Sequence, residues 1–145
     1  METDPLAGTI GGQFMLAHRY ARAATNRALQ VHDVELRHLG VLGTLAEVGP
    51  MSQRALADRL QLDKSSMVYI IDELERQGLA TRTKDERDRR SYAVRITDAG
   101  SERLAAAADT AGEVMTGLLT PLTPEERRHL HDLLARFIEY AAARS

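Results

Sequence analysis

The segment from Ser52 to Gly78 constrains the fold more than any other part of this chain. Ser52 is a good N-cap for a short helix over residues 53–60, and Asp63 caps a second helix after a brief turn. The second helix carries four apolar side chains at the i, i+3, i+4 and i+7 positions of one face, namely Met67, Ile70, Ile71 and Leu74. Gly78 then supplies the left-handed residue that commonly ends a helix. The pattern predicts two amphipathic helices joined by a tight turn, a helix-turn-helix.

The outer face of the second helix has the chemistry to contact DNA. A helix fits the major groove, where every base pair shows a distinct set of donors, acceptors and methyl groups. Lys64 can contact phosphate or guanine, and Val68 can meet a thymine methyl group. The candidate DNA contacts of this segment are Ser52, Gln53, Lys64, Ser65, Ser66, Val68 and Tyr69. The alternative is an ordinary amphipathic helix pair with a solvated outer face.

A charged hairpin is predicted directly after the two helices. Residues 79–83 and 91–96 have the pattern of two short strands, and seven consecutive charged residues, Lys84 to Arg90, lie between them. The window from Arg76 to Arg95 carries +4, although the whole chain carries −2. Arginines at such a tip can enter the minor groove, and the candidates are Arg87, Arg89 and Arg90. Most charge runs are only solvated turns, but this one follows a helix-turn-helix, which favours a DNA-binding wing.

Helices are predicted on both sides of this unit. Residues 1–12 are expected to form an irregular arm, followed by helices over about 13–30 and 35–47. Thr97 caps a long helix, and the Thr123-Pro124 pair starts the last one. The last helix carries an apolar stripe of Leu130, Leu133, Leu134, Phe137 and Ile138. The expected fold is mainly α with a small β-hairpin wing (α+β), a winged helix-turn-helix with terminal dimerisation helices.

One domain over residues 1–145 is expected. Residues 35–100 would form the winged helix-turn-helix, and residues 13–34 and 101–145 the dimerisation helices. The terminal stripe and the alanine-rich first helix expose more apolar surface than a small winged domain can cover, which favours a homodimer. A stripe at this spacing also fits an intramolecular core.

Composition excludes several classes of function. There is no cysteine, so disulfides, thiolate metal sites and thiol redox switches are excluded. The acidic N-terminus resembles no signal peptide, and no apolar run is long enough for a membrane span, so a cytoplasmic protein without a membrane partner is expected. No phosphate-binding loop, nucleophile elbow or metal-hydrolase motif is present, so neither an enzyme nor a cofactor is expected.

Histidines raise a metal-binding alternative. His129 and His131 lie on different faces of the last predicted helix and cannot easily share one ion. His32, Asp33, Glu35 and His38 lie closer together but straddle a helix start. No metal site is therefore expected.

Three ordered motifs resemble those of the MarR family of bacterial and archaeal regulators. They are Leu74-Glu75-Arg76-Gln77-Gly78-Leu79, Asp88-Arg89-Arg90-Ser91 and Val94-Arg95-Ile96-Thr97-Asp98-Ala99-Gly100. The resemblance implies a homodimeric repressor on a pseudo-palindromic double-stranded DNA operator, released by a small aromatic or lipophilic effector. Tyr69 departs from the arginine often found at its position, so the family's operator preference does not transfer.

The resemblance also places an effector cleft between the dimer helices and the DNA-binding unit. His18, Tyr20, Arg22 and His38 have suitable chemistry to line it, although their spacing is not diagnostic and a structural or exposed role is favoured for each. Two functions remain: a ligand-responsive DNA-binding repressor, or a winged-helix module that binds a protein partner. The salt dependence of duplex binding discriminates between them.

Overall fold

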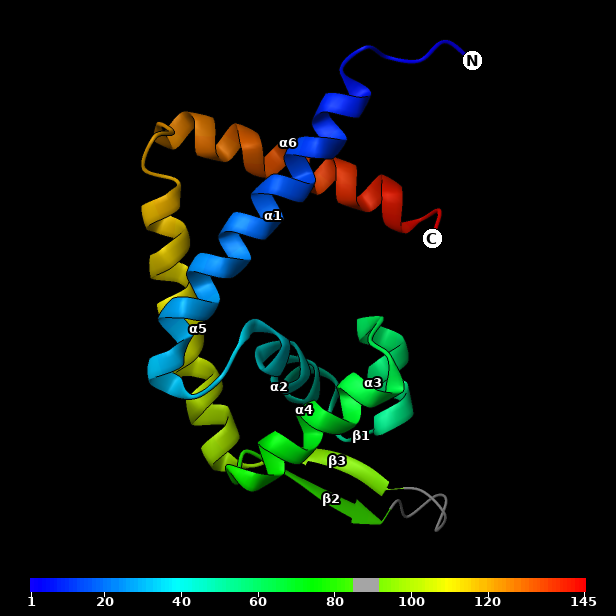
Figure 1. The fold of residues 1–145 in the computed structure, drawn as a ribbon, viewed down its shortest axis with the longest axis vertical. Coiled ribbons are helices and arrows are strands. Elements are labelled where there is room, and N and C mark those ends of the chain that lie inside the picture. The colour runs from blue at the N-terminus through cyan, green and yellow to red at the C-terminus, as the bar shows by residue number, and fades with distance from the viewer. Residues whose placement is uncertain (85–91) are drawn as a thin grey trace.

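The computed structural model describes residues 1–84 and 92–145. The elements of this part are α1 (Ala7–Leu29), the 3-10 helix η1 (Gln30–His32), α2 (Leu36–Val48), β1 (Met51–Ser52), α3 (Gln53–Leu60), α4 (Lys64–Arg76), β2 (Ala80–Lys84), β3 (Tyr92–Ile96), α5 (Asp98–Leu118) and α6 (Pro124–Ala142). Figure 1 shows α2, α3, α4 and the sheet gathered at one end of the molecule, with α6 at the other and α5 running between them. The mainly α fold with a small sheet is confirmed.

The helix-turn-helix is confirmed, and its inner face forms the centre of the core. Met67, Ile70, Ile71 and Leu74 of α4 are all fully buried. They pack in one cluster with residues of the neighbouring elements, among them Leu42, Leu56, Leu79 and Val94. Complete burial of a side chain of this size contributes roughly 1.5–3 kcal/mol. The stripe therefore fixes which side of α4 faces inward.

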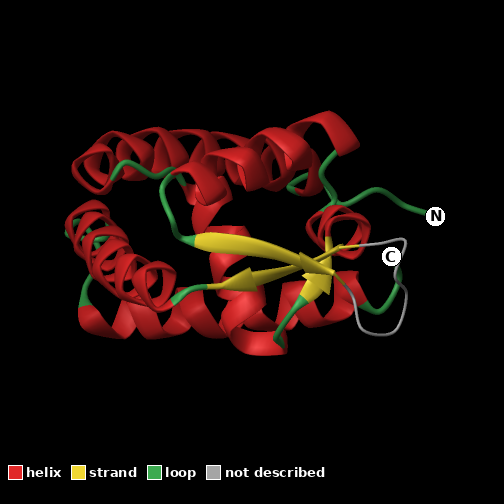
Figure 2. Ribbon diagram, turned by 90° about the horizontal axis from the view of Figure 1, so that it is seen from below, coloured by secondary structure: helices red, strands yellow, loops and turns green. Residues whose placement is uncertain are grey.

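The sheet contains one strand more than the predicted hairpin. Its order is β1-β3-β2, with both pairs antiparallel (Figure 2). Met51 of β1 pairs with Val94, and Lys84 of β2 pairs with Tyr92 of β3. The two residues of β1 are too few to show the alternation by which a strand is recognised in sequence. Their pairing joins the start of α3 to the wing.

The helix α1 begins at Ala7, so the predicted irregular arm over residues 1–12 is wrong beyond its first half. The backbone N–H of Leu6 donates to the Asp4 carboxylate at 2.8 Å, which satisfies one of the free donors at the helix start. Three early glycines each weaken a helix by roughly 0.5–1 kcal/mol relative to alanine, and the sequence prediction gave them too much weight. Farther along, Phe14 meets Phe137 of α6 with ring centroids 4.7 Å apart.

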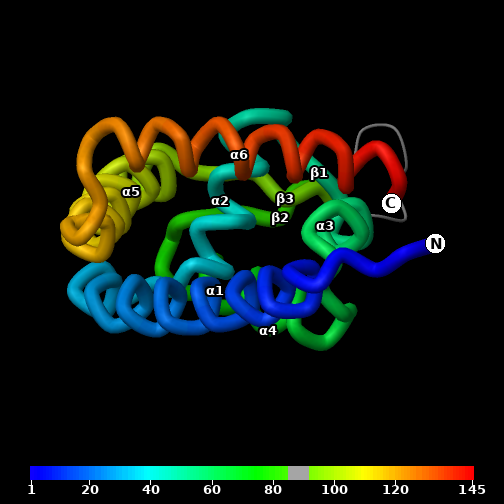
Figure 3. Tube along the Cα trace, turned by 90° about the horizontal axis from the view of Figure 1, so that it is seen from above, coloured from blue at the N-terminus to red at the C-terminus, as the bar shows by residue number. Residues whose placement is uncertain are grey.

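Together, α1, α5 and α6 form a helical extension, called the arm below. The winged unit, which consists of α2, α3, α4 and the sheet, leaves most of this extension uncovered. Figure 1 shows α6 crossing α1 at an angle, and Figure 3 shows both helices on the side away from the sheet, with α5 at one end. No residue of α6 is buried, and α1 buries only Thr25 and Leu29. Within the described ranges, no helix has the length and apolarity that a bilayer crossing requires.

A close backbone approach joins α5 to the winged unit. Thr97 caps α5 by accepting from the Gly100 N–H at 3.0 Å, and its hydroxyl donates to the Gly78 carbonyl at 2.7 Å. A Cβ at position 100 would lie 2.1 Å from the Leu79 carbonyl oxygen. Only glycine allows this approach.

We expect Gly100→Ala to lower the free energy of unfolding by roughly 1–3 kcal/mol, because the methyl group must displace backbone. The measurement is urea unfolding followed by circular dichroism. Gly112→Ala is the matched control, since an added Cβ there meets nothing within 4 Å and alanine favours the helix. Equal stability of the Gly100→Ala variant and the wild type would contradict the close approach.

Candidate nucleic-acid interface

Two N-caps and one tight turn set the angle between α3 and α4. The Ser52 hydroxyl accepts from the Ala55 N–H at 3.1 Å, and the Asp63 carboxylate accepts from the Ser66 N–H at 2.6 Å. The Ser66 hydrogen bonds hold the pKa of Asp63 below its ordinary value. Between the helices Gln61 adopts a left-handed conformation with φ of 53°. The predicted caps are thus both present, and Ser52 uses its hydroxyl to begin α3.

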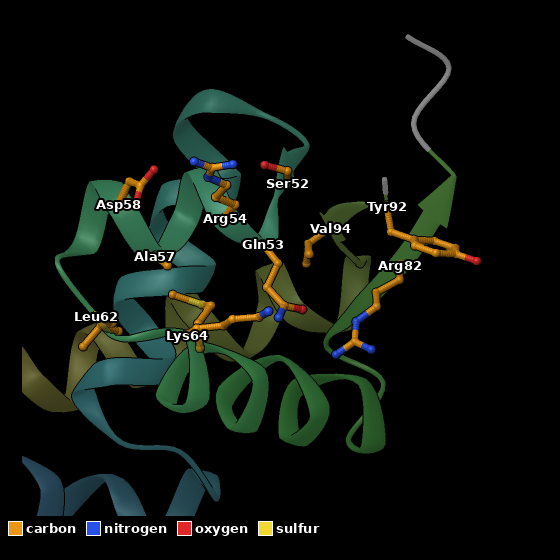
Figure 4. A pocket seen from close by; sticks show the side chains of 11 residues that line it. Ser52, Gln53, Arg54, Ala57, Asp58, Leu62, Lys64, Arg82, Tyr92 and Val94 are labelled. Atoms are coloured by element: carbon orange, nitrogen blue, oxygen red, sulfur yellow. The ribbon is translucent and has the colours of Figure 1, made fainter. Parts of the chain in front are cut away.

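An open cavity of about 910 Å³ lies between α3, the start of α4 and the strands β2 and β3 (Figure 4). Three of the predicted DNA contacts, Ser52, Gln53 and Lys64, line it together. Its other lining residues are Arg54, Ala57, Asp58, Leu62, Met67, Arg82, Tyr92 and Val94. Three of these lining side chains are basic and one is acidic, a balance that suits phosphate.

Arg82 is held in place by carboxylates of α4. Its guanidinium pairs with Asp72, and its Nε lies 2.9 Å from the Glu75 carboxylate. These ion pairs tie β2 to the outer side of α4. They also compensate part of the positive charge, so Lys64 and Arg54 are the more available cations of the cavity.

The remaining predicted contacts of α4 lie outside this cavity. Ser65 and Tyr69 are exposed, whereas Ser66 and Val68 are half-buried at the flanks of the outer face. Tyr69 retains 51% of its surface exposure. The sequence pattern predicted all of them as exposed, because helical spacing gives the direction of a side chain but not what its neighbours cover.

A second, smaller cavity of about 260 Å³ adjoins the other flank of α4. Its lining includes Arg37, His38, Tyr69 and Glu73. His38 is 2% exposed, and its two ring nitrogens contact the Glu35 N–H at 2.9 Å and the Glu73 carboxylate at 2.8 Å. The Tyr69 hydroxyl donates to the other oxygen of Glu73 at 3.0 Å. A side chain on the outer face of α4 is therefore linked to the start of α2.

The four residues predicted for an effector cleft do not come together in one protomer. His18, Tyr20 and Arg22 are exposed on α1 and are not among the residues lining the cavity beside His38. His38 instead completes the capping box of α2 with Glu35. This is the structural role that the sequence left open for it.

The wing arginines Arg87, Arg89 and Arg90 lie outside the described residues. The strands that lead to them are in place, with Lys84 and Tyr92 as the last paired residues of β2 and β3. Their contact with DNA stays a prediction.

Several side chains at this surface were missed by the sequence analysis. Arg54, Arg82 and Tyr92 line the larger cavity, and Arg37 and Glu73 line the smaller one. The basic window contained Arg82, which was a usable signal. Glu73 offered none, because its partner His38 lies 35 residues away in the chain.

The predicted dimer residues of α6 form an exposed apolar stripe. Leu130, Leu133, Phe137 and Ile138 are 38%, 44%, 52% and 60% exposed, and Leu134 is half-buried. A contiguous surface of this kind marks an interaction site.

The histidine cluster considered for a metal is engaged in other contacts. The His32 Nε2 lies 2.8 Å from the Thr110 hydroxyl, and both nitrogens of His38 have partners. Among residues 1–84 and 92–145, no group of three or more metal-ligating side chains is assembled.

Comparison with known proteins shows which family shares this architecture. A family model described as MarR family matches residues 32–91. A putative transcriptional regulatory protein for the hcr operon of Thauera aromatica is 30% identical over 136 residues, which cover 90% of this chain and 80% of that protein. An uncharacterized HTH-type transcriptional regulator of Bacillus subtilis, YdgJ, is 32% identical over 98 residues, which cover 68% of this chain but only 60% of that protein.

The fold matches wild-type MarR from E. coli in its apo form with a TM-score of 0.84 at 21% identity, covering 95% of this chain and 99% of that one. The relatives are transcriptional regulators rather than enzymes.

The network at Glu73 predicts a pH-dependent contribution to stability. Burial alone would raise the pKa of Glu73, but the hydrogen bonds from Tyr69 and His38 and the charge of Arg76 outweigh it, so the pKa lies below its ordinary value of 4.5. The folded state therefore favours the carboxylate, and its contribution is present above pH 4.5 and lost as the pH falls through the lowered pKa.

We expect Glu73→Gln to be less stable than the wild type at neutral pH, with a difference that shrinks below pH 4.5. Urea unfolding between about pH 3 and pH 7 measures both proteins. A stability difference that stays constant across this range would contradict the role of the Glu73 charge.

Proposed function

The chain belongs to the MarR family of transcriptional regulators and binds DNA, and from that premise we propose that it is a homodimeric, sequence-specific repressor released from a pseudo-palindromic operator by a small-molecule effector. The observation that carries the proposal is the arrangement of α4. Its inner face is buried, while its N-terminal turn and outer face stand exposed beside a basic cavity. A helix presented in this way fits the major groove.

The proposal divides the predicted contacts into two roles. Lys64 and Gln53, together with Arg54, line the basic cavity and would contact the phosphate backbone. Ser65 and Tyr69 stand on the outer face of α4 and would meet base edges. Ser52 and Ser66 are placed at the starts of α3 and α4, where backbone N–H groups favour phosphate. Val68 and the wing residues Arg87, Arg89 and Arg90 complete the proposed interface.

The dimer is supported by the apolar surface of the arm. The α6 stripe stays exposed in one protomer, as do Met15, Leu16 and Tyr20 of α1. We propose that residues 13–34 and 101–145 form the dimer interface, because a second copy would remove this surface from water. Two-fold symmetry would then set two recognition helices about 34–36 Å apart, one turn of DNA.

The effector site is proposed to form only in the dimer. The cavity beside His38 has about 260 Å³, somewhat less than a typical ligand pocket of roughly 300–1,000 Å³. The α1 side chains His18, Tyr20 and Arg22 would need a second wall, which the partner protomer would provide. A small aromatic or lipophilic effector is the class that the family suggests.

Selection of bound sites from random duplex DNA tests the proposal. We expect enrichment of a pseudo-palindrome. The logarithm of the binding constant should fall linearly with the logarithm of the salt concentration, with a slope of about −0.9 for each phosphate contact.

Lys64→Ala should weaken binding to all sequences and reduce the size of this slope by about one contact. Arg128→Ala is the control, because it removes a positive charge from an exposed position of α6. Absence of duplex binding at low salt would refute DNA recognition and favour a protein-binding module.

We expect Phe137→Asp to raise the dimer dissociation constant roughly 100-fold or more, because a carboxylate would be buried without a partner. Sedimentation equilibrium measures the association. Ala135→Asp is the control, since it introduces the same charge two residues away, on nearly the opposite face of α6. A Phe137→Asp variant that dimerises like the wild type would remove α6 from the interface.

A further inference from the structure

A chain of hydrogen bonds runs from the start of α2 to the outer face of α4. The backbone N–H of Glu35 donates to Nδ1 of His38, so this nitrogen carries no proton. In the neutral ring the proton then lies on Nε2, which donates to one oxygen of Glu73 at 2.8 Å. The other oxygen of Glu73 accepts from the Tyr69 hydroxyl at 3.0 Å. Each group in this chain therefore has a defined direction of donation.

The hydrogen-bonded series is buried at its His38 end and exposed at its Tyr69 end. His38 is 2% exposed within the fold, whereas the Glu73 side chain retains 25% exposure and Tyr69 retains 51%. Removing either partner from the His38 ring would leave a buried polar group unsatisfied, which is costly. The buried His38 therefore fixes which atom donates to Glu73, and Glu73 in turn accepts the proton of the exposed Tyr69 hydroxyl.

The ring of Tyr69 is also held from the side. The guanidinium of Arg37 lies 5.1 Å from the ring centroid, within the range of a cation–π contact. Arg37 is itself paired with the Glu35 carboxylate at 3.0 Å. Contacts at the hydroxyl and at one side of the ring restrict its rotamers before DNA arrives.

The Tyr69 hydroxyl already donates its proton to Glu73, and this limits the base atoms that Tyr69 can recognise. A tyrosine hydroxyl has one proton to donate and lone pairs that accept. Because that proton is given to Glu73, the oxygen is left as an acceptor. In the major groove, adenine N6 and cytosine N4 are the amino donors, whereas guanine O6 and N7 and thymine O4 are acceptors.

We propose that Glu73, oriented by His38, is a specificity-determining positioning residue that makes Tyr69 an obligate hydrogen-bond acceptor and so selects a base with a major-groove amino group. This inference rests on the proposed function, in which the outer face of α4 meets base edges. Glu73 itself does not touch DNA in this scheme. It acts only through the direction of one hydrogen bond.

Glu73→Gln reverses that direction with little change of shape. The amide oxygen of the introduced side chain has to accept from His38 Nε2–H, because the His38 proton is fixed by Glu35. The amide NH2 then points to the Tyr69 oxygen, and the hydroxyl proton becomes free to donate to DNA. The buried histidine keeps its partner, so the fold is preserved. Tyr69→Phe, a change at the surface, removes the hydroxyl while leaving the His38–Glu73 contact intact.

The experiment selects bound sites from random duplexes with the full-length wild type and both variants, followed by titration of single-base variants of the enriched site. We expect the wild type to prefer adenine or cytosine at one position of each half-site by about 3- to 10-fold, the effect of one hydrogen bond. Tyr69→Phe should lose this preference. Glu73→Gln should shift it to guanine or thymine at the same position, a change that general destabilisation does not produce.

Glu47→Gln is the matched control, because it removes the same charge from an exposed position of α2. It should keep the wild-type preference. An unchanged base preference in Glu73→Gln, or in Tyr69→Phe, overturns the inference while leaving sequence-specific binding in place. If the wild type enriches no sequence at all, the proposed function fails and the inference fails with it.

Discussion

Burial of the inner face of α4 is the constraint on which the rest of the structure depends. Met67, Ile70, Ile71 and Leu74 are removed from water by α2, α3, the sheet and one another. Because a helix is rigid, fixing one face also fixes the opposite one. Ser65 and Tyr69 are exposed for this reason. The exposure of this face is in this sense a consequence of core packing.

The same helix is tied to the arm at its C-terminal end. Arg103 of α5 donates to the His32 carbonyl at 2.6 Å and to the Gln77 side chain at 2.8 Å. Gln77 donates in turn to the Asp33 carbonyl at 2.9 Å. These bonds join α5, the α1–α2 connection and the end of α4 at one junction. The arm and the end of α4 are therefore connected by short hydrogen bonds rather than by a flexible linker.

Charge is distributed so that an acidic protein can present a basic surface. The chain carries −2 overall, yet the cavity between α3, α4 and the sheet has three basic side chains against one carboxylate. Asp72 and Glu75 of α4 pair with Arg82 and compensate its charge, which leaves Lys64 and Arg54 as the available cations, and Glu73 is directed to His38. Each acidic group of the recognition helix is thus occupied by a protein partner. The arrangement limits repulsion of phosphate without requiring a basic protein.

Local signals made much of this fold predictable. The caps Ser52, Asp63, Thr97 and Thr123 all accept the hydrogen bonds that the sequence indicated, because a cap depends on residues only three positions apart. The apolar stripe of α4 and the left-handed Gly78, with φ of 73°, were predictable for the same reason. The start of α1 was not, since isolated glycines only weaken a helix and do not by themselves prevent one from starting.

The sequence by itself determined the helices, their inner faces and the place of the wing, because these follow from periodicity and capping along the chain. Only the tertiary structure decided that β1 pairs with β3, that Gly100 lies against Leu79, and that His38 meets Glu73. Those contacts join residues far apart in sequence, and their energies depend on how whole elements pack. No local pattern encodes that packing, and for this reason the residue that orients Tyr69 was visible only in the folded protein.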